Sequence, residues 1–280
     1  MFHIASRSLG RRGSCRAAAT WLSVGLLFTT LGTDRLTAQS ATPTSGADVL
    51  TRMHDAYAGR WYHTLTFVQK TTIRRKDGTD TVQTWYESLR HTPQSGTRLR
   101  IDFGHPSAGN GVIYTADSSY RMRGGKLVTS AASGNEFLPL IEGVYVQPVE
   151  RTVREIAPSG VDMKRVSTGT HDNRKVWIVG AASPTDSTSP QFWVDAESKV
   201  LVRMILRPDK NSPPIDVRLD KYEKAGSTVL ATRIEMFIGG SPAQAEEYFD
   251  WKVDVPLDPA LFDAATYSSA KHWVKTAAGG

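Results

Sequence analysis

Hydrophobic and polar residues alternate with a period of two along most of the chain from Leu65 onwards, a pattern typical of β-strands. Asp77-Gly78 marks a tight hairpin turn between the first two β-rich segments. Strands are predicted at 65–75, 79–89, 98–103, 111–115, 119–123, 126–129, 175–180, 191–195, 200–206, 215–223, 228–238 and 245–253. This succession of hairpins favours an antiparallel meander and a mainly β fold.

The last strands alternate cleanly enough to assign their two faces. The apolar face contains Val217, Leu219, Ile234, Met236, Phe249, Trp251 and Val253. Charged residues dominate the opposite face, which at the end of the chain also contains Tyr248, Asp250 and Lys252. An apolar sheet face must be covered by helices or a second sheet, or it must leave a cavity for an apolar ligand. The alternation leaves these outcomes open.

Helices are predicted in only a few places. Ser45 and Asp48 approximate a capping box for an amphipathic helix that ends at Gly59. Between the two runs of strands, 136–146 and 148–156 are predicted as short helices, and Pro148 suits the first turn of the second one. We expect these short helices to form a lid over the sheet.

The first 40 residues have the pattern of a cleavable secretory signal. Basic residues at 7–16 precede an apolar run at 17–31, and small residues then lead to a cleavage site before Ala41. The run of 15 residues is shorter than the ~20 that a bilayer core demands, which disfavours a membrane anchor. The predicted organisation is a signal peptide at 1–40, a linker at 41–46, one domain at 47–268 and a C-terminal tail at 269–280.

Charge and cysteine content exclude several classes of protein. The formal charge is +6, but the first 40 residues hold five arginines and one aspartate, so the rest of the chain carries about +2. This near-neutral body gives no electrostatic basis for binding nucleic acid. Cys15 is the only cysteine and precedes the apolar run. The mature protein is therefore predicted to have no disulfide, no thiolate metal site and no lipid anchor.

No pattern of catalytic residues emerges from the sequence. Gly109-Asn110-Gly111 lacks the third glycine of a dinucleotide loop, and the seven histidines show no metal-ligand spacing. Glu246 and Glu247 are neighbours on a strand and should point to opposite faces, so they cannot share a proton. We predict a protein that is not an enzyme and has no catalytic residue, metal or cofactor. The tryptophans suit either a packed core or the wall of an apolar cavity.

Three stretches of the chain resemble the LolA-type outer-membrane lipoprotein carrier and lipoprotein-sorting family. The first is the helix and strand at 47–70, the second is Phe192-Trp193-Val194-Asp195 with Val200-Leu201-Val202-Arg203, and the third is the closing run at 222–262. This resemblance implies a half-open antiparallel β-barrel, with an N-terminal helix and short lid helices over an apolar concave face. It spans most of the predicted mature chain.

The resemblance also implies a function in the periplasm. A family member of this kind binds acyl chains of lipoproteins or free lipid and transfers them across the periplasm, as a monomer. Its partners would be an inner-membrane lipoprotein-releasing transporter and an outer-membrane acceptor. The alternative is an RseB-like sensor or interaction module on the same fold. An extracytoplasmic hydrolase is a third hypothesis, which lacks the titratable cluster it would need.

The apolar alternation combined with this resemblance gives candidate site residues. The cavity wall is predicted to contain Leu99, Ile101, Phe103, Tyr120, Met122, Met204, Val217, Leu219, Ile234, Met236, Phe249 and Trp251. The lid is predicted to contain Leu138, Ile141, Val149 and Val153. Carriers of this family have an Arg-Pro pair whose arginine holds the lid shut, whereas Arg90 here is separated from Pro93 by two residues. Arg90 is therefore a candidate latch that departs from the family pattern.

Overall fold

The computed structural model describes residues 42–275 except 76, 93 and 184. The predicted signal peptide at 1–40 lies outside the described residues. The chain divides after Ala41 into two units, and the second unit contains every element described below. Within the described part of the chain, no helix is both long enough and apolar enough to cross a membrane.

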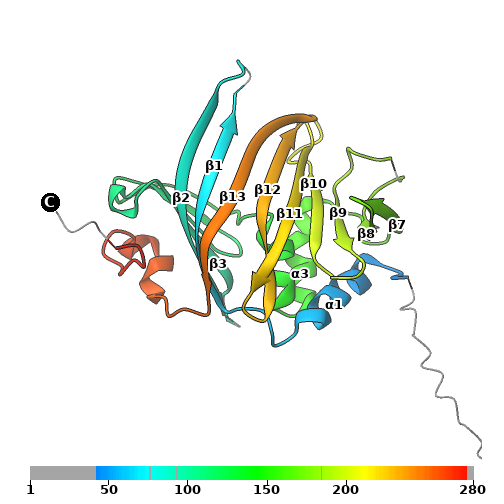
Figure 1. Ribbon diagram of the computed structural model, residues 1–280, viewed down its shortest axis with the longest axis horizontal. Coiled ribbons are helices and arrows are strands. Elements are labelled where there is room, and N and C mark those ends of the chain that lie inside the picture. The colour runs from blue at the N-terminus through cyan, green and yellow to red at the C-terminus, as the bar shows by residue number, and fades with distance from the viewer. Residues whose placement is uncertain (1–41, 76, 93, 184, 276–280) are drawn as a thin grey trace, which may run out of the picture. The chain divides into compact units, whose positions relative to one another are not determined.

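One antiparallel sheet of 13 strands dominates this unit (Figure 1). The first meander comprises β1 (Thr64–Arg74), β2 (Asp80–Thr92), β3 (Gly96–Phe103), β4 (Gly111–Tyr114), β5 (Ser119–Arg123) and β6 (Lys126–Ala131). The second comprises β7 (Val166–His171), β8 (Arg174–Val179), β9 (Gln191–Asp195), β10 (Leu201–Leu206), β11 (Ile215–Ala225), β12 (Thr228–Ile238) and β13 (Ser241–Val253). Pairing of β1 with β13 joins the two meanders.

The sheet is curved but not closed. Its strand order runs β6-β5-β4-β3-β2-β1-β13-β12-β11-β10-β9-β8-β7, so β6 and β7 form its two edges among the described strands. The predicted half-open antiparallel architecture is confirmed. The sequence pattern did not predict β7, because Val166-Ser167-Thr168-Gly169-Thr170-His171 contains only one large apolar residue. This edge strand pairs with β8 alone and needs no apolar alternation.

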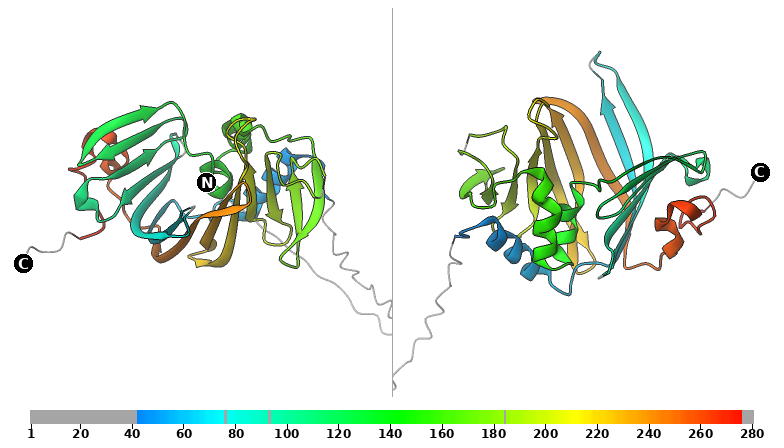
Figure 2. Two further views of the ribbon diagram at one scale, coloured as in Figure 1. Left: turned by 90° about the horizontal axis from the view of Figure 1, so that it is seen from above. Right: turned by 180° about the vertical axis from the view of Figure 1, so that it is seen from behind.

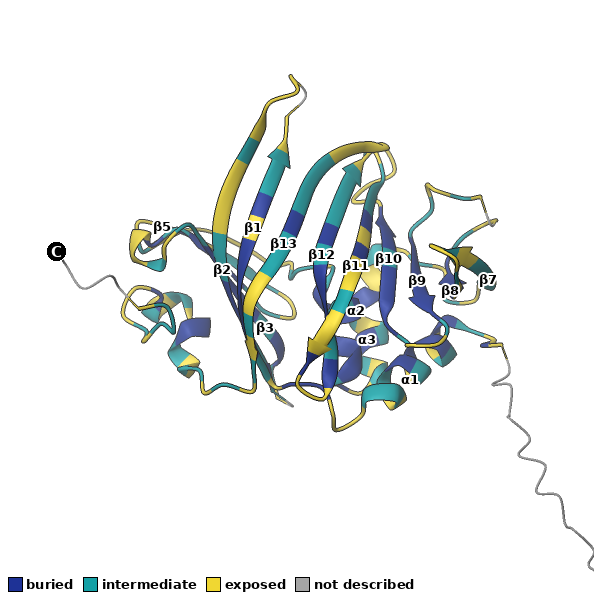
Figure 3. Ribbon diagram, viewed as in Figure 1, coloured by how far each residue is buried: buried dark blue, intermediate teal, exposed yellow. Residues whose placement is uncertain are grey.

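Short helices lie against one face of the sheet. They are α1 (Gly46–Tyr57), α2 (Leu138–Ile141), η2 (Gly143–Tyr145), α3 (Val149–Ile156) and η3 (Ala157–Ser159). As predicted, Ser45 caps α1, since its side-chain oxygen accepts a hydrogen bond from the Asp48 backbone N–H at 3.1 Å. Seen from behind, the helices lie over β10 to β12 (Figure 2). Buried residues of α1, α2 and η2 join those of the inner sheet face in one core (Figure 3).

The C-terminal segment covers part of the opposite, outer face of the sheet. It contains η4 (Pro259–Phe262) and η5 (Ala264–Thr266), while η1 (Pro106–Ala108) lies between β3 and β4. Tyr267 packs with Ile113 and Met122 in a separate apolar cluster. Residues 269–275, predicted as part of a tail, also contact the sheet, because Trp273 donates a hydrogen bond from Nε1 to Ser88 at 2.8 Å.

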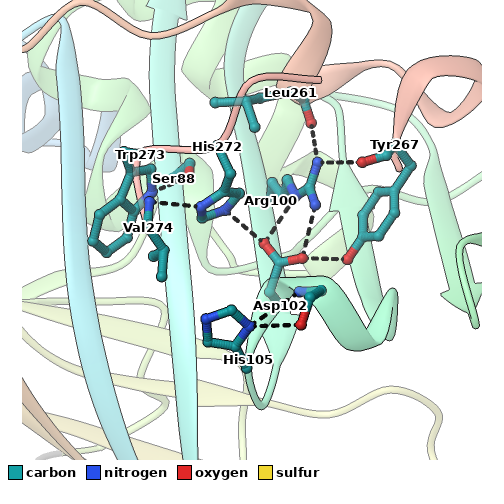
Figure 4. A network of polar contacts seen from close by, with 10 residues as sticks. Ser88, Arg100, Asp102, His105, Leu261, Tyr267, His272, Trp273 and Val274 are labelled. Atoms are coloured by element: carbon teal, nitrogen blue, oxygen red, sulfur yellow. Dashed lines mark hydrogen bonds and ion pairs between the residues drawn. The ribbon is translucent and has the colours of Figure 1, made fainter. Parts of the chain in front are cut away.

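A buried ion pair fastens this C-terminal segment to β3 (Figure 4). Arg100 donates from Nε and Nη2 to the two Asp102 oxygens, each at 2.8 Å. Tyr267 and His272 also contact Asp102, at 2.6 and 3.2 Å. Burial alone would raise the pKa of Asp102, but the hydrogen bonds from His272, Arg100 and Tyr267 outweigh burial and hold the pKa below its usual value.

Candidate functional site

An apolar cavity of about 110 Å³ lies between the inner face of the sheet and the lid segment, which we define as residues 138–145 (α2 and η2). Six strands line it, together with Trp61 and Tyr62 before β1 and residues of the lid segment. The wall contains Leu65, Phe67, Trp85, Glu87, Leu89, Leu99, Ile101, Val217, Leu219, Tyr222, Val229, Leu230, Ala231, Ile234, Met236, Glu246 and Tyr248. Asn135, Phe137, Leu138, Ile141, Glu142 and Tyr145 complete it.

Eight of the residues named from the sequence lie together around this cavity. They are Leu99, Ile101, Val217, Leu219, Ile234 and Met236 on the sheet, and Leu138 and Ile141 on the lid segment. The six sheet residues come from strands in both halves of the chain. The β1–β13 pairing brings those halves together, which explains how distant segments form one wall. Their role in binding lipid remains a prediction.

Other predicted wall residues lie elsewhere in the fold. Met204 is fully buried in the core and does not line the cavity. Met122 and Tyr120 pack in the outer-face cluster with Tyr267. Phe103 contacts the Trp85 ring edge-on, with ring centroids 4.8 Å apart, and is also outside the wall. The alternation identifies apolar positions but not the face they occupy. Part of the outer face is apolar as well, because the C-terminal segment packs on it.

A β-bulge corrects the predicted assignment of faces in β13. The register between β1 and β13 shifts between Thr66 and Val68, and Asp250 adopts a left-handed backbone with φ of 53°. As a result Tyr248 lines the cavity, whereas Phe249 is 40% exposed. Trp251 returns to the inner side beyond the bulge and packs against the core without lining the cavity. The uninterrupted alternation assumed from the sequence therefore placed Phe249 on the wrong face.

The predicted lid residues divide between two elements. Leu138 and Ile141 on α2 line the cavity, whereas Val149 and Val153 on α3 pack against the core and lie outside the wall. Tyr145 on η2 makes an aromatic contact between the lid segment and Trp61. Its ring stacks on Trp61, with centroids 3.9 Å apart and planes inclined by 21°.

Glu142 makes several of the polar contacts that hold the lid segment in place, beside the Tyr145 hydroxyl, which accepts a hydrogen bond from the Leu201 backbone N–H at 3.2 Å. Its carboxylate accepts hydrogen bonds from Trp61 Nε1 at 3.0 Å and from Tyr62 OH at 2.7 Å. His91 Nε2 lies 3.3 Å from the same carboxylate, and His91 Nδ1 lies 2.9 Å from the Thr97 hydroxyl. The Glu142 side chain is only 5% exposed, so these contacts are shielded from water.

Arg90, the candidate latch, does not make these contacts. It pairs through the backbone with Thr64 and Arg98, and within the described chain no hydrogen bond or ion pair joins its side chain to the lid segment. The neighbouring residue His91 points to Glu142 instead. On a strand, successive side chains face opposite sides, so a shift of one residue decides which side chain can reach the lid.

Two further carboxyl groups lie in the cavity wall. Burial raises the pKa of Glu87 well above its usual value, and the charges of Glu246 and Asp102 raise it further. Burial also raises the pKa of Glu246, although hydrogen bonds from Tyr248, Gln244 and Gln69 oppose the shift. The sequence shows Glu246 only as a neighbour of Glu247, and it gives no signal for Glu87, which has no charged residue beside it in the chain.

The curved open sheet with helices on its inner face is the arrangement that the resemblance to the LolA-type family implied. No family model matches the sequence, and no curated protein matches it. Solved structures do match. A DUF1329 family protein from Desulfovibrio piger is 13% identical, with 79% of this chain and 97% of that chain covered and a TM-score of 0.55.

A second solved structure is a domain from Vibrio parahaemolyticus assigned to outer membrane lipoprotein sorting. It is 10% identical over 80% of this chain and 98% of that chain, with a TM-score of 0.56. A LolA superfamily protein from Nitrosomonas europaea is also similar, at 10% identity, 78% and 97% coverage and a TM-score of 0.46. The expected resemblance to the lipoprotein-sorting family is thus confirmed for the fold.

Proposed function

We propose that this chain is a periplasmic carrier that holds acyl chains of lipoproteins or free lipids and transfers them towards the outer membrane. The observation that carries the proposal is the apolar cavity between the inner sheet face and the lid segment. The likeness of the fold to an outer membrane lipoprotein-sorting domain supports it. The function requires no catalytic residue and no cofactor.

Burial of the chain supplies the binding energy. Each methylene group removed from water contributes about 0.8 kcal/mol. Roughly ten buried methylenes would therefore supply about 8 kcal/mol, which corresponds to a dissociation constant on the order of 1 μM. Such an affinity is strong enough to extract a chain from a donor and weak enough to release it to an acceptor.

The cavity is too small to hold an acyl chain unless the lid segment moves. A cavity of roughly 150 Å³ takes up one benzene molecule, so the 110 Å³ seen here holds only a few carbon atoms. Loading an acyl chain therefore requires the lid segment to move away from the sheet. Glu142 and the Tyr145–Trp61 stack must separate from their partners in that movement.

Carriage needs a donor and an acceptor at opposite membranes. In this proposal the donor is an inner-membrane lipoprotein-releasing transporter, and the acceptor is an outer-membrane protein or the membrane itself. In this proposal the carrier acts as a monomer, since elements of one chain supply the cavity wall described here.

Transfer between vesicles tests this function. Donor vesicles contain a pyrene-labelled acyl lipid and acceptor vesicles contain none, so pyrene excimer emission falls as lipid moves. We expect the transfer rate to rise in proportion to protein concentration. An Ile101→Glu variant should lose at least 90% of this activity, because it places a charge in the cavity wall. Transfer that the protein does not accelerate would refute the carrier function.

An interaction module on the same fold is the second candidate. Edge strand β6 favours it, because all six of its residues are exposed, and Leu127 and Val128 are 50% and 52% exposed. An unpaired strand edge can bind another chain by adding a strand to the sheet. A protein that binds no acyl probe but retains an envelope protein partner would support this candidate over the carrier.

A further inference from the structure

Besides Glu142 of the lid segment, two carboxyl groups on the sheet lie in the largely apolar cavity wall. Glu87 lies in the middle of β2, with Phe67 and Ile101 as its backbone partners on either side. Glu246 lies on β13, and the two residues are only 5% and 6% exposed. Both line the same cavity wall. Apolar cargo alone gives no reason for buried carboxyl groups at these positions, since such groups are costly to bury without partners.

The two carboxyls differ in their partners. Glu246 accepts hydrogen bonds from Tyr248 OH at 2.8 Å and from Gln244 Nε2 at 2.6 Å. Glu87, in contrast, has no hydrogen bond or ion pair to any residue in the described part of the chain. It is a polar side chain nine-tenths buried, turned into the cavity and left without a partner.

The cavity wall also contains no counter-charge for these groups. Among the described residues that line it there is no lysine, arginine or histidine. An anionic ligand head placed beside Glu87 and Glu246 would meet acceptor oxygens and negative potential. A head group that donates hydrogen bonds would give Glu87 the partner it lacks. An ammonium group would in addition place a positive charge beside the carboxyl group and so stabilise its ionised form.

We propose that Glu87 and Glu246 select the polar head of the cargo, favouring alkyl chains with an ammonium head over chains with a carboxylate or phosphate head. This selectivity rests on the proposed carrier function and specifies the class of amphiphile that the cavity accepts. The apolar wall supplies affinity for the chain, and the two carboxyls decide which head can accompany it.

Competition binding at pH 7.5 tests the selectivity. The uncharged dye Nile red fills the cavity of the chain from Ala41, and dodecylammonium, 1-dodecanol and dodecanoate displace it below their micelle concentrations. We expect dodecylammonium to bind about tenfold or more tightly than dodecanoate, with dodecanol between them. The body of the protein carries about +2, so non-specific attraction would favour the opposite order.

Matched variants assign the effect to these residues. Glu87→Gln and Glu246→Gln keep the side-chain shape, and each should bring the ratio of the two dissociation constants to within about threefold. Glu247→Gln is the control, because Glu247 lies next to Glu246 on β13 but pairs with Lys70 at 2.9 Å on the exposed side. It should leave the ratio unchanged. Circular dichroism confirms that each variant is folded.

The outcomes separate this proposal from the carrier function. If Nile red binds and dodecanoate competes as well as dodecylammonium, the selectivity is overturned and the carrier function stands. If neither the dye nor any competitor binds, both proposals are overturned. The order of the three competitors on the unmodified protein is decisive even if a variant fails to fold.

Discussion

Removal of the Glu142 carboxylate should release the lid segment. Glu142 accepts hydrogen bonds from Trp61 and Tyr62, and His91 Nε2 lies 3.3 Å away. Glu142→Gln keeps the shape of the side chain but replaces one acceptor oxygen by an amide that donates. Glu142→Leu removes every acceptor and leaves the polar atoms of Trp61 and Tyr62 buried without partners.

The magnitude follows from the hydrogen bonds that are lost. A hydrogen bond to a charged group contributes about 1.5–3 kcal/mol, and a buried donor left unpaired costs about 1–3 kcal/mol. Glu142→Gln should therefore weaken the closed lid by about 1.5–3 kcal/mol, and Glu142→Leu by about 3–6 kcal/mol. Since 1.4 kcal/mol corresponds to a factor of ten, the open state should become at least tenfold more populated in Glu142→Gln.

Hydrogen–deuterium exchange followed by mass spectrometry measures this opening. Peptides that cover residues 138–145 should exchange at least tenfold faster in Glu142→Gln than in the unmodified protein, while peptides from β10 and β11 keep their protection. Glu136→Gln is the matched control, because Glu136 is exposed and lies just before the lid segment. Unchanged protection of residues 138–145 in both Glu142 variants would refute the assigned role of this carboxylate.

Three further predictions concern charge and the bulge in β13. Asp102→Asn should destabilise the fold by about 3–5 kcal/mol at pH 7, because it leaves Arg100 buried without its counter-charge. The pKa of Asp102 is lowered in the fold, so the stabilisation by this carboxylate is present above about pH 4 and is lost as the pH falls further. In urea unfolding at several pH values, the difference in unfolding free energy between the unmodified protein and Asp102→Asn should therefore shrink at low pH. The pKa of Glu87 is raised in the fold, so this carboxyl group destabilises the folded state at pH 7. Glu87→Gln should therefore raise the melting temperature at pH 7, and this gain should disappear below about pH 4.5. Tyr248→Glu should weaken Nile red binding at least tenfold, whereas Phe249→Glu should leave it unchanged, and equal effects of the two would contradict the bulge.

Local patterns in the sequence were sufficient to predict most of the fold. Ser45 and the apolar residues after it define the first helix, and Asp77-Gly78 defines the first hairpin, where Gly78 has a φ of 81°. These features depend on residues close together in the chain. The pairing of β1 with β13 depends on residues far apart, and no local pattern fixes the register there.

The site was less predictable than the fold for three physical reasons. The bulge at Asp250 reverses the alternation, so Tyr248 rather than Phe249 faces the cavity. The C-terminal segment makes the outer face of β5 apolar as well, so Met122 has the same pattern as a wall residue. Polar residues such as Glu142 acquire their role only from long-range contacts, which a strand pattern does not contain.

Native mass spectrometry with lipid extraction tests whether the cavity holds acyl chains. The chain from Ala41 is purified from the periplasm without detergent, beside a Met236→Glu variant in the cavity wall and a Phe249→Glu control on the exposed side. We expect an added mass of co-bound acyl lipid on the unmodified protein and the control. That mass should disappear on delipidation and be absent from Met236→Glu. Ligand-free protein that also takes up no acyl lipid, or equal lipid retention by Met236→Glu, would contradict the assignment of this cavity as the acyl-chain site.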